Sequence, residues 1–127
     1  MFAPVGVLAA CAAAVTLVHV RDPGVDGHYP ACPFLSVTGY YCPGCGSLRA
    51  IHALSNGDPI TALSRNPLTV VMAVVLAVIV ALWARWEWRG GGRIWVAPPW
   101  MLWGFLGVVL LFWVLRNMPG MTWLSPV

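Results

Sequence analysis

The chain contains no lysine and is poor in charged residues of every kind. Only 9% of its 127 residues are charged: seven arginines and four acidic residues give a net charge of +3. A water-soluble globular domain carries about 25% charged residues, so this chain has too few to cover a surface exposed to water. The arginines are scattered singly, without a basic patch interleaved with aromatic residues, which argues against nucleic acid as a partner.

The chain also lacks the residue patterns of most enzymes and transporters. No charged residue lies within residues 2–20, 68–84 or 96–115, so the charged groups that mark an ion or proton path through a membrane are missing. No glycine-rich phosphate loop follows a predicted strand. Internal repeats and low-complexity stretches are absent as well. The sequence therefore favours a non-catalytic protein.

Apolar residues make up 60% of the chain, and the mean hydropathy is +0.80. They gather in three long segments, at residues 2–20, 68–86 and 96–116, each close to the roughly 20 residues that cross a bilayer as a helix. We therefore expect an all-α membrane protein, a single membrane domain over residues 1–127, with about three transmembrane helices and a short tail at 117–127.

The first segment has an alternative interpretation, because Leu8-Ala9-Ala10-Cys11 resembles a bacterial lipoprotein processing site. The absence of basic residues before Leu8 argues against a signal peptide. The bias toward Arg, Ala, Gly, Pro and Trp suggests a bacterial source with a high-GC genome.

Orientation follows from the loop at residues 87–95. Together with Arg85, its arginines Arg89 and Arg93 outnumber the single acid Glu87, and short basic loops tend to stay cytoplasmic. We expect a multi-pass protein of the bacterial inner membrane. Its cysteine-bearing loop, residues 21–67, would then be extracytoplasmic.

That loop carries signals for local structure. Residues 34–41 are apolar and aromatic, which suggests an extended or re-entrant segment against the bilayer surface. Helical spacing predicts a helix at 46–55, which Asn56-Gly57 ends. Asp58 and Pro59 start a second at 59–65, and Asn66-Pro67 ends it and caps the second span. We expect a compact helical hairpin at the membrane interface.

The loop resembles a family of small bacterial membrane proteins catalogued as domain of unknown function 2752, over about residues 32–82. The resemblance implies a multi-pass membrane protein with a Cys-Pro-x-Cys-Gly signature and no established activity. It is carried by these residues and motifs: Cys32-Pro33-Phe34, Thr38-Gly39-Tyr40-Tyr41-Cys42-Pro43-Gly44-Cys45-Gly46, Arg49-Ala50, His52-Ala53-Leu54, Gly57-Asp58, Ala62 and Asn66-Pro67.

Several chemistries remain open for the cysteines. Cys32, Cys42, Cys45 and His52 together have the ligand types of a zinc site. Cys32 paired with Cys42 or Cys45 would instead form a structural disulfide, and a Cys42–Cys45 pair would be a labile redox disulfide. The thiols also suit plain burial in a tight turn, with His52 as a structural histidine.

The remaining candidate residues shape and anchor the loop. Arg49 is placed to bind carbonyls of the cysteine turn, Asp58 or a lipid phosphate. We expect an accessory subunit that packs against lipids and other membrane proteins, with zinc as the one candidate cofactor; the alternative is a thiol-redox or zinc-dependent factor acting through Cys42 and Cys45. The turn and anchoring residues are Pro43, Gly44, Gly46, Arg49, Asp58, Asn66 and Pro67.

Overall fold

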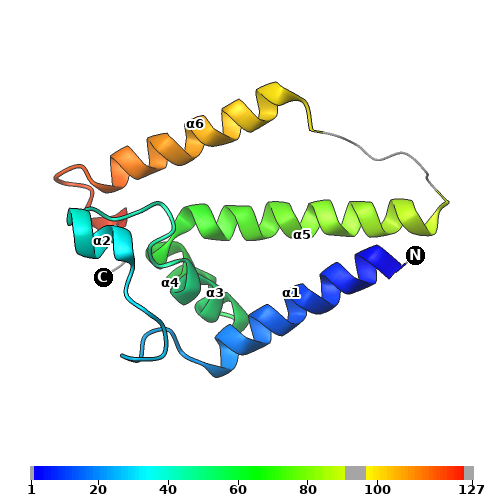
Figure 1. Ribbon diagram of the computed structural model, residues 1–127, viewed down its shortest axis with the longest axis horizontal. Coiled ribbons are helices and arrows are strands. Elements are labelled where there is room, and N and C mark those ends of the chain that lie inside the picture. Colours follow the sequence, from blue (N-terminus) through cyan, green and yellow to red (C-terminus); the bar gives the residue numbers. More distant parts are fainter. Residues whose placement is uncertain (1, 91–96, 125–127) are drawn as a thin grey trace.

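The computed structural model describes residues 2–90 and 97–124, and these residues form helices and no strand (Figure 1). The expected start of the third span and Arg93 of the basic loop lie outside the described residues. The short helices gather at one end of the molecule, and the three long helices extend from there toward the other end (Figure 1). The helices are α1 (Phe2–Val20), α2 (Pro33–Thr38), α3 (Ser47–Ser55), α4 (Pro59–Arg65), α5 (Pro67–Trp88), α6 (Pro99–Arg116) and the 3₁₀ turn η1 (Thr122–Leu124).

Of the two conformations expected for residues 34–41, extended or re-entrant, the extended one was wrong, because α2 occupies residues 34–38. Pro33 stands at the first helical position, where its missing N–H costs no hydrogen bond. Gly39 ends the helix with a φ of 74°, a conformation that favours glycine, and its N–H bonds to the Leu35 carbonyl at 2.9 Å. The apolar composition of the segment concealed these two end signals.

Two consecutive helices begin in the same way, with an aspartate or asparagine cap followed by a proline. Asp58 accepts a hydrogen bond from the Thr61 N–H at 3.0 Å and Pro59 follows at the first helical position of α4. Asn66 accepts one from the Thr69 N–H at 3.0 Å ahead of Pro67 in α5. Each side-chain oxygen satisfies a backbone donor that has no partner within the helix.

Asn66 also joins the start of α5 to the cysteine turn. Its Nδ2 group donates to the carbonyls of Pro43 at 3.0 Å and Cys45 at 3.2 Å, and lies 3.3 Å from the Ser47 hydroxyl. The side chain is fully buried. Because buried carbonyls need a donor, this amide supplies what the turn cannot satisfy by itself.

Small side chains form the core between α3, α4 and α5. Ala50 and Ala62 are completely buried and Ala53 nearly so, with Leu54 and Val70 packed against them. Helix α1 lies against α3 and α5. The small alanine side chains let these helix backbones approach closely.

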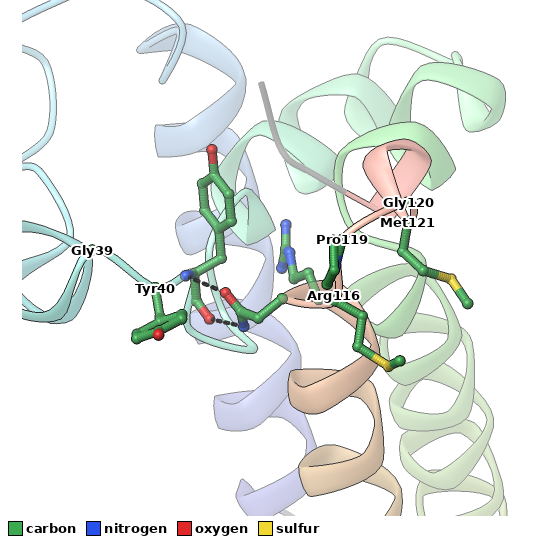
Figure 2. A pocket seen from close by; sticks show the side chains of 9 residues that line it. Gly39, Tyr40, Arg116, Pro119, Gly120 and Met121 are labelled. Carbon is green, nitrogen blue, oxygen red and sulfur yellow. Dashed lines mark hydrogen bonds between the residues drawn. The ribbon is translucent and has the colours of Figure 1, made fainter.

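Helix α6 attaches to the same end of the molecule through its last residues. Asn117 forms two hydrogen bonds of 2.9 Å with the backbone N–H and carbonyl of Tyr41. Phe34 of α2 meets Trp113 edge to face at 6.0 Å between ring centroids. Beside these contacts is a hollow of about 360 Å³ whose lining includes Tyr40 and Arg116 (Figure 2).

Helices α5 and α6 are long and apolar enough to cross a membrane. Their most apolar windows have mean hydropathies of 2.6 and 1.6, and only 6% of each window is buried inside the protein. The apolar part of α1, Val5–Val20, is shorter. Most of the apolar surface of these helices therefore has no partner among the described residues.

Replacing Asn66 by alanine should destabilise the protein by about 2–4 kcal/mol, because the change removes a helix cap and leaves buried carbonyls without a donor. Thermal unfolding in detergent measures the effect. Asn56→Ala is the matched control: Asn56 is exposed, so its loss should cost less than about 1 kcal/mol. Equal losses for the two variants would contradict this role of Asn66.

Candidate functional site

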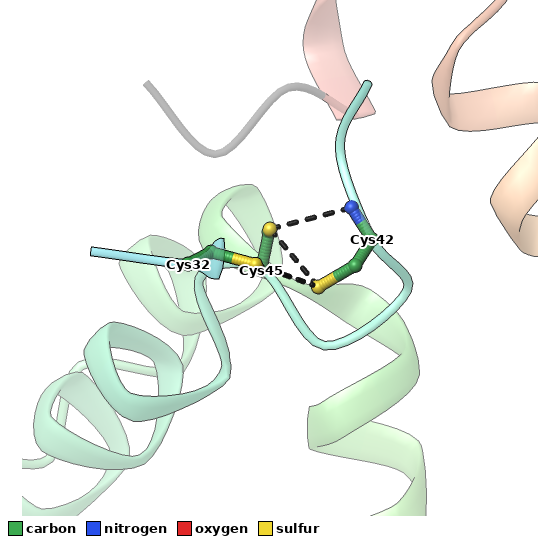
Figure 3. A group of neighbouring side chains, drawn as sticks. All are labelled: Cys32, Cys42 and Cys45. Carbon is green, nitrogen blue, oxygen red and sulfur yellow. Dashed lines mark hydrogen bonds between the residues drawn. The ribbon is translucent and has the colours of Figure 1, made fainter. Parts of the chain in front are cut away.

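The three loop cysteines lie close together although Cys42 follows Cys32 by ten positions in the chain (Figure 3). The sulfur atoms of Cys32 and Cys42 are 3.5 Å apart, and those of Cys42 and Cys45 are 3.0 Å apart. All three lie within 4.8 Å of one another. The thiols are free, so the cluster is available for a metal ion or a disulfide.

The turn that carries Cys42 and Cys45 is shaped by glycine at one position. Gly46 has a φ of 82°, a backbone conformation that residues other than glycine adopt only with strain. A Cβ on Gly44 would meet the Cys42 sulfur at 3.8 Å, an ordinary contact. The Cys45 N–H bonds to the Cys42 carbonyl at 3.1 Å, so backbone hydrogen bonding sets the spacing of these two thiols.

The thiols differ in their tendency to ionise. Burial raises the pKa of the Cys45 thiol to about 12, and the neighbouring Cys42 thiol adds to the effect. The pKa of the Cys32 thiol is lowered, chiefly by the backbone N–H of Leu35 near the start of α2. Cys32 is therefore a better nucleophile near neutral pH than Cys45.

Arg116 reaches the cysteine turn from the end of α6. Its Nη1 lies 3.4 Å from the Cys42 carbonyl and its Nη2 lies 3.3 Å from the Arg65 carbonyl, while only 3% of the residue is exposed. It also lies over the rings of Tyr41 and Phe112. Sequence reasoning missed this contact: an arginine followed by an asparagine ends an apolar helix, but nothing in that pattern identifies the partner.

Other predicted residues lie away from the thiols. The Nδ1 atom of His52 is 2.9 Å from the Val18 carbonyl, and its Nε2 atom is 3.9 Å from a carboxylate oxygen of Asp22. The structure thus turns His52 toward the end of α1. Arg49 directs its Nε toward the Pro23 carbonyl at 3.5 Å, and Asp58 caps α4. Pro43 and Asn66, in contrast, belong to the cysteine turn and its support.

Fold and site together define an all-helical protein with apolar helices and a three-thiol cluster at the end where its short helices gather. Residues 32–80 match the model of a family described as "Protein of unknown function (DUF2752)", which confirms the resemblance drawn from the sequence. The match includes all three thiols and Asn66, but Arg116 lies beyond it. No curated protein and no solved structure matches the chain.

In reduced protein carrying Cys11→Ser, iodoacetamide at about pH 8 should modify Cys32 at least about tenfold faster than Cys45, because only the thiolate reacts. The Cys32 rate should level off below the ordinary thiol pKa, whereas the Cys45 rate should still rise in alkaline solution. Mass spectrometry of peptides from a time course measures both rates. In the unfolded protein the two rates should converge; equal rates in the folded protein would refute the difference.

Proposed function

We propose that the chain is a multi-pass protein of the bacterial inner membrane with α1, α5 and α6 as its three membrane-spanning helices. At 1.5 Å per residue, the 19 residues of α1 extend about 28 Å, close to the thickness of the hydrocarbon core. The short helices would then form an interfacial hairpin and turn on one side. This arrangement is supported by the position of the end of α1, the start of α5 and the end of α6 at one end of the molecule (Figure 1).

The direction of insertion in this proposal rests on charge. Arg85 and Arg89 lie at the end of α5, far from the start of the helix where the thiols are. Short loops rich in arginine tend to stay cytoplasmic. The arginines near the end of α5 are concentrated in one short stretch, whereas Arg21, Arg49 and Arg65 are spread over a longer loop that also carries three aspartates. We therefore place the end of α5 in the cytoplasm. The cysteine cluster is then extracytoplasmic, together with Arg116 and the end of α6.

Within the membrane we propose a non-catalytic role, as a subunit that packs against helices of another membrane protein. The observation that carries this proposal is the slight burial of α5 and α6, at 6% of their apolar windows. Lipid covers part of that surface. On α6, however, a Cβ added to Gly104 or Gly107 would meet nothing within 4 Å, and small residues in membrane helices allow close approach of a second helix.

The Gly104→Leu/Gly107→Leu double variant should release the protein from its native membrane complex. We expect the wild type, extracted in a mild detergent, to run as a defined complex with a second membrane protein in stoichiometric amount. The double variant should shift at least about tenfold more of the chain to the monomer, because the added side chains prevent close helix contact.

Leu102→Phe is the matched control, since it adds volume at an exposed position on the opposite face of α6 and should leave the complex intact. Native mass spectrometry measures the distribution. A wild type that is a clean monomer, or a complex made only of copies of this chain, would overturn the proposed role.

A second candidate function is favoured by the sulfur cluster: a thiol-redox or zinc-dependent membrane factor acting through Cys42 and Cys45. Three sulfur atoms within 4.8 Å of one another are its supporting observation. A cluster of this size suits either a disulfide between two of the thiols or coordination of one soft ion by all three.

Labelling intact cells with a membrane-impermeant thiol reagent tests both the insertion and this second candidate. In the Cys11→Ser background, the loop thiols should react only after a reductant opens a disulfide or a chelator removes a metal. The Glu87→Cys variant should react at that position only after the membrane is permeabilised, because residue 87 lies on the cytoplasmic side in this proposal. Immediate reaction of the loop thiols would reject the second candidate, and reaction confined to permeabilised cells would reverse the proposed orientation.

A further inference from the structure

The sulfur cluster has nearly the dimensions of a three-thiolate metal site. Zinc–sulfur bonds of about 2.3 Å in a tetrahedron place the sulfur atoms about 3.8 Å apart. The observed separations of 3.5 Å and 3.0 Å, with all three atoms within 4.8 Å, need only small side-chain shifts to reach that value. The hydrogen bond from the Cys45 N–H to the Cys42 carbonyl does not involve a sulfur atom, so side-chain shifts leave it intact. The bond from the Cys42 N–H to the Cys45 sulfur moves with that sulfur.

The described residues offer three ligands and no fourth. Histidine, cysteine and acidic side chains other than Cys32, Cys42 and Cys45 do not join the group. His52, the expected fourth ligand, is engaged with the Val18 carbonyl. Structural zinc sites are normally closed by four protein ligands, whereas sites with three protein ligands keep a position for an external one.

Arg116 is a buried cation beside the cysteine turn. The guanidinium group is almost fully buried, yet its described hydrogen bonds go only to neutral carbonyls and its Nε has no partner. No ion pair with a carboxylate is described for it. Two residues that carry ionisable side chains lie within its reach: the Cys42 carbonyl is 3.4 Å from Nη1, and the guanidinium carbon lies 5.9 Å from the centre of the Tyr41 ring. A buried cation without a counter-charge is costly. Among the described residues, Arg116 is therefore a positive charge at the cysteine turn, 3.4 Å from the Cys42 carbonyl, without a carboxylate partner.

Charge balance connects the two observations. Three thiolates around a divalent ion carry a net charge of −1, and one guanidinium cation cancels it. We propose that Cys32, Cys42 and Cys45 bind a thiophilic divalent cation of the Zn²⁺ class, with Arg116 as the counter-charge and the fourth coordination position open to an external ligand. This inference rests on the second candidate function and extends it to Arg116, which comes from a helix outside the family match.

The full-length reduced protein, purified in detergent and titrated with Co²⁺ as a spectroscopic probe, tests the site. The wild type should develop a thiolate-to-cobalt charge-transfer band, and competition with Zn²⁺ should yield its affinity. Cys45→Ser should lose the band. His52→Ala should keep it with affinity within about twofold, since this histidine is not a ligand here. X-ray absorption of the zinc form should count three sulfur neighbours and one lighter atom.

The role of Arg116 is tested by its charge. Arg116→Gln should weaken Zn²⁺ binding at least about tenfold, while Arg116→Lys should retain most of the affinity, because the buried negative charge then keeps a cation beside it. Arg49→Gln is the matched control, since its Nε faces Pro23 rather than the thiols, and it should bind as the wild type does.

The results distinguish failure of the metal site from failure of the role given to Arg116. A wild type that binds neither ion rejects the metal site and the zinc form of the second candidate together. A wild type that binds while Arg116→Gln binds equally well overturns the role of Arg116 alone. If Arg116→Gln does not fold, a folded Arg116→Lys that fails to bind overturns that role as well. Loss of binding in His52→Ala, or four sulfur neighbours, overturns the open position.

Discussion

The side-chain amide of Asn66 connects three parts of the chain that would otherwise be independent. Its backbone N–H ends α4 at the Ala62 carbonyl, its Oδ1 atom starts α5, and its Nδ2 group holds the carbonyls of Pro43 and Cys45. The Cys45 carbonyl is buried and the backbone groups of Pro43 and Thr69 are partly buried, and such groups cost free energy without a partner. The position of the thiols relative to α5 therefore depends on a residue that lies 21 positions beyond Cys45.

The end of the molecule that holds the thiols and the long helices α5 and α6 are stabilised in different ways. At the thiol end, hydrogen bonds and a small alanine core fix the short helices. Along α5 and α6, few side chains are buried within the chain. In a bilayer, lipid covers apolar side chains about as well as another helix does, so burial supplies little force to draw the helices together. The polar contacts of Asn117 and Arg116, together with the ring contact between Phe34 and Trp113, attach α6 to the thiol end.

The position of each thiol relative to Asn66 also affects how readily it ionises. Cys45 is buried because it lies between the Asn66 amide and the start of α3, whereas Cys32 arrives from the start of α2 and is more exposed. One thiol is therefore held neutral and the other ionises more readily. Arg116 adds a cation from a third direction. An ion would draw on all of these features at once, because coordination requires deprotonated sulfur and a balanced charge.

Much of the architecture could be predicted from local patterns. The long apolar segments, the starts at Asp58-Pro59 and Asn66-Pro67, and the stop at Asn56-Gly57 are signals read within a few residues, and the helices begin and end beside them. The family resemblance was equally visible in the cysteine motif. The expectation for residues 34–41 failed because apolar and aromatic composition does not by itself distinguish a short helix from an extended segment.

The sequence by itself determined the all-helical class, the apolar helices and the presence of a paired-cysteine turn, because these depend on composition and on contacts between near neighbours in the chain. Only the tertiary structure decided which residues complete the site. It brought Cys32 to the turn, directed His52 to α1, and placed Arg116 against a carbonyl 74 residues earlier. Such contacts depend on how separate helices pack and on which buried groups still need a hydrogen-bond partner or a counter-charge, and no local pattern specifies either.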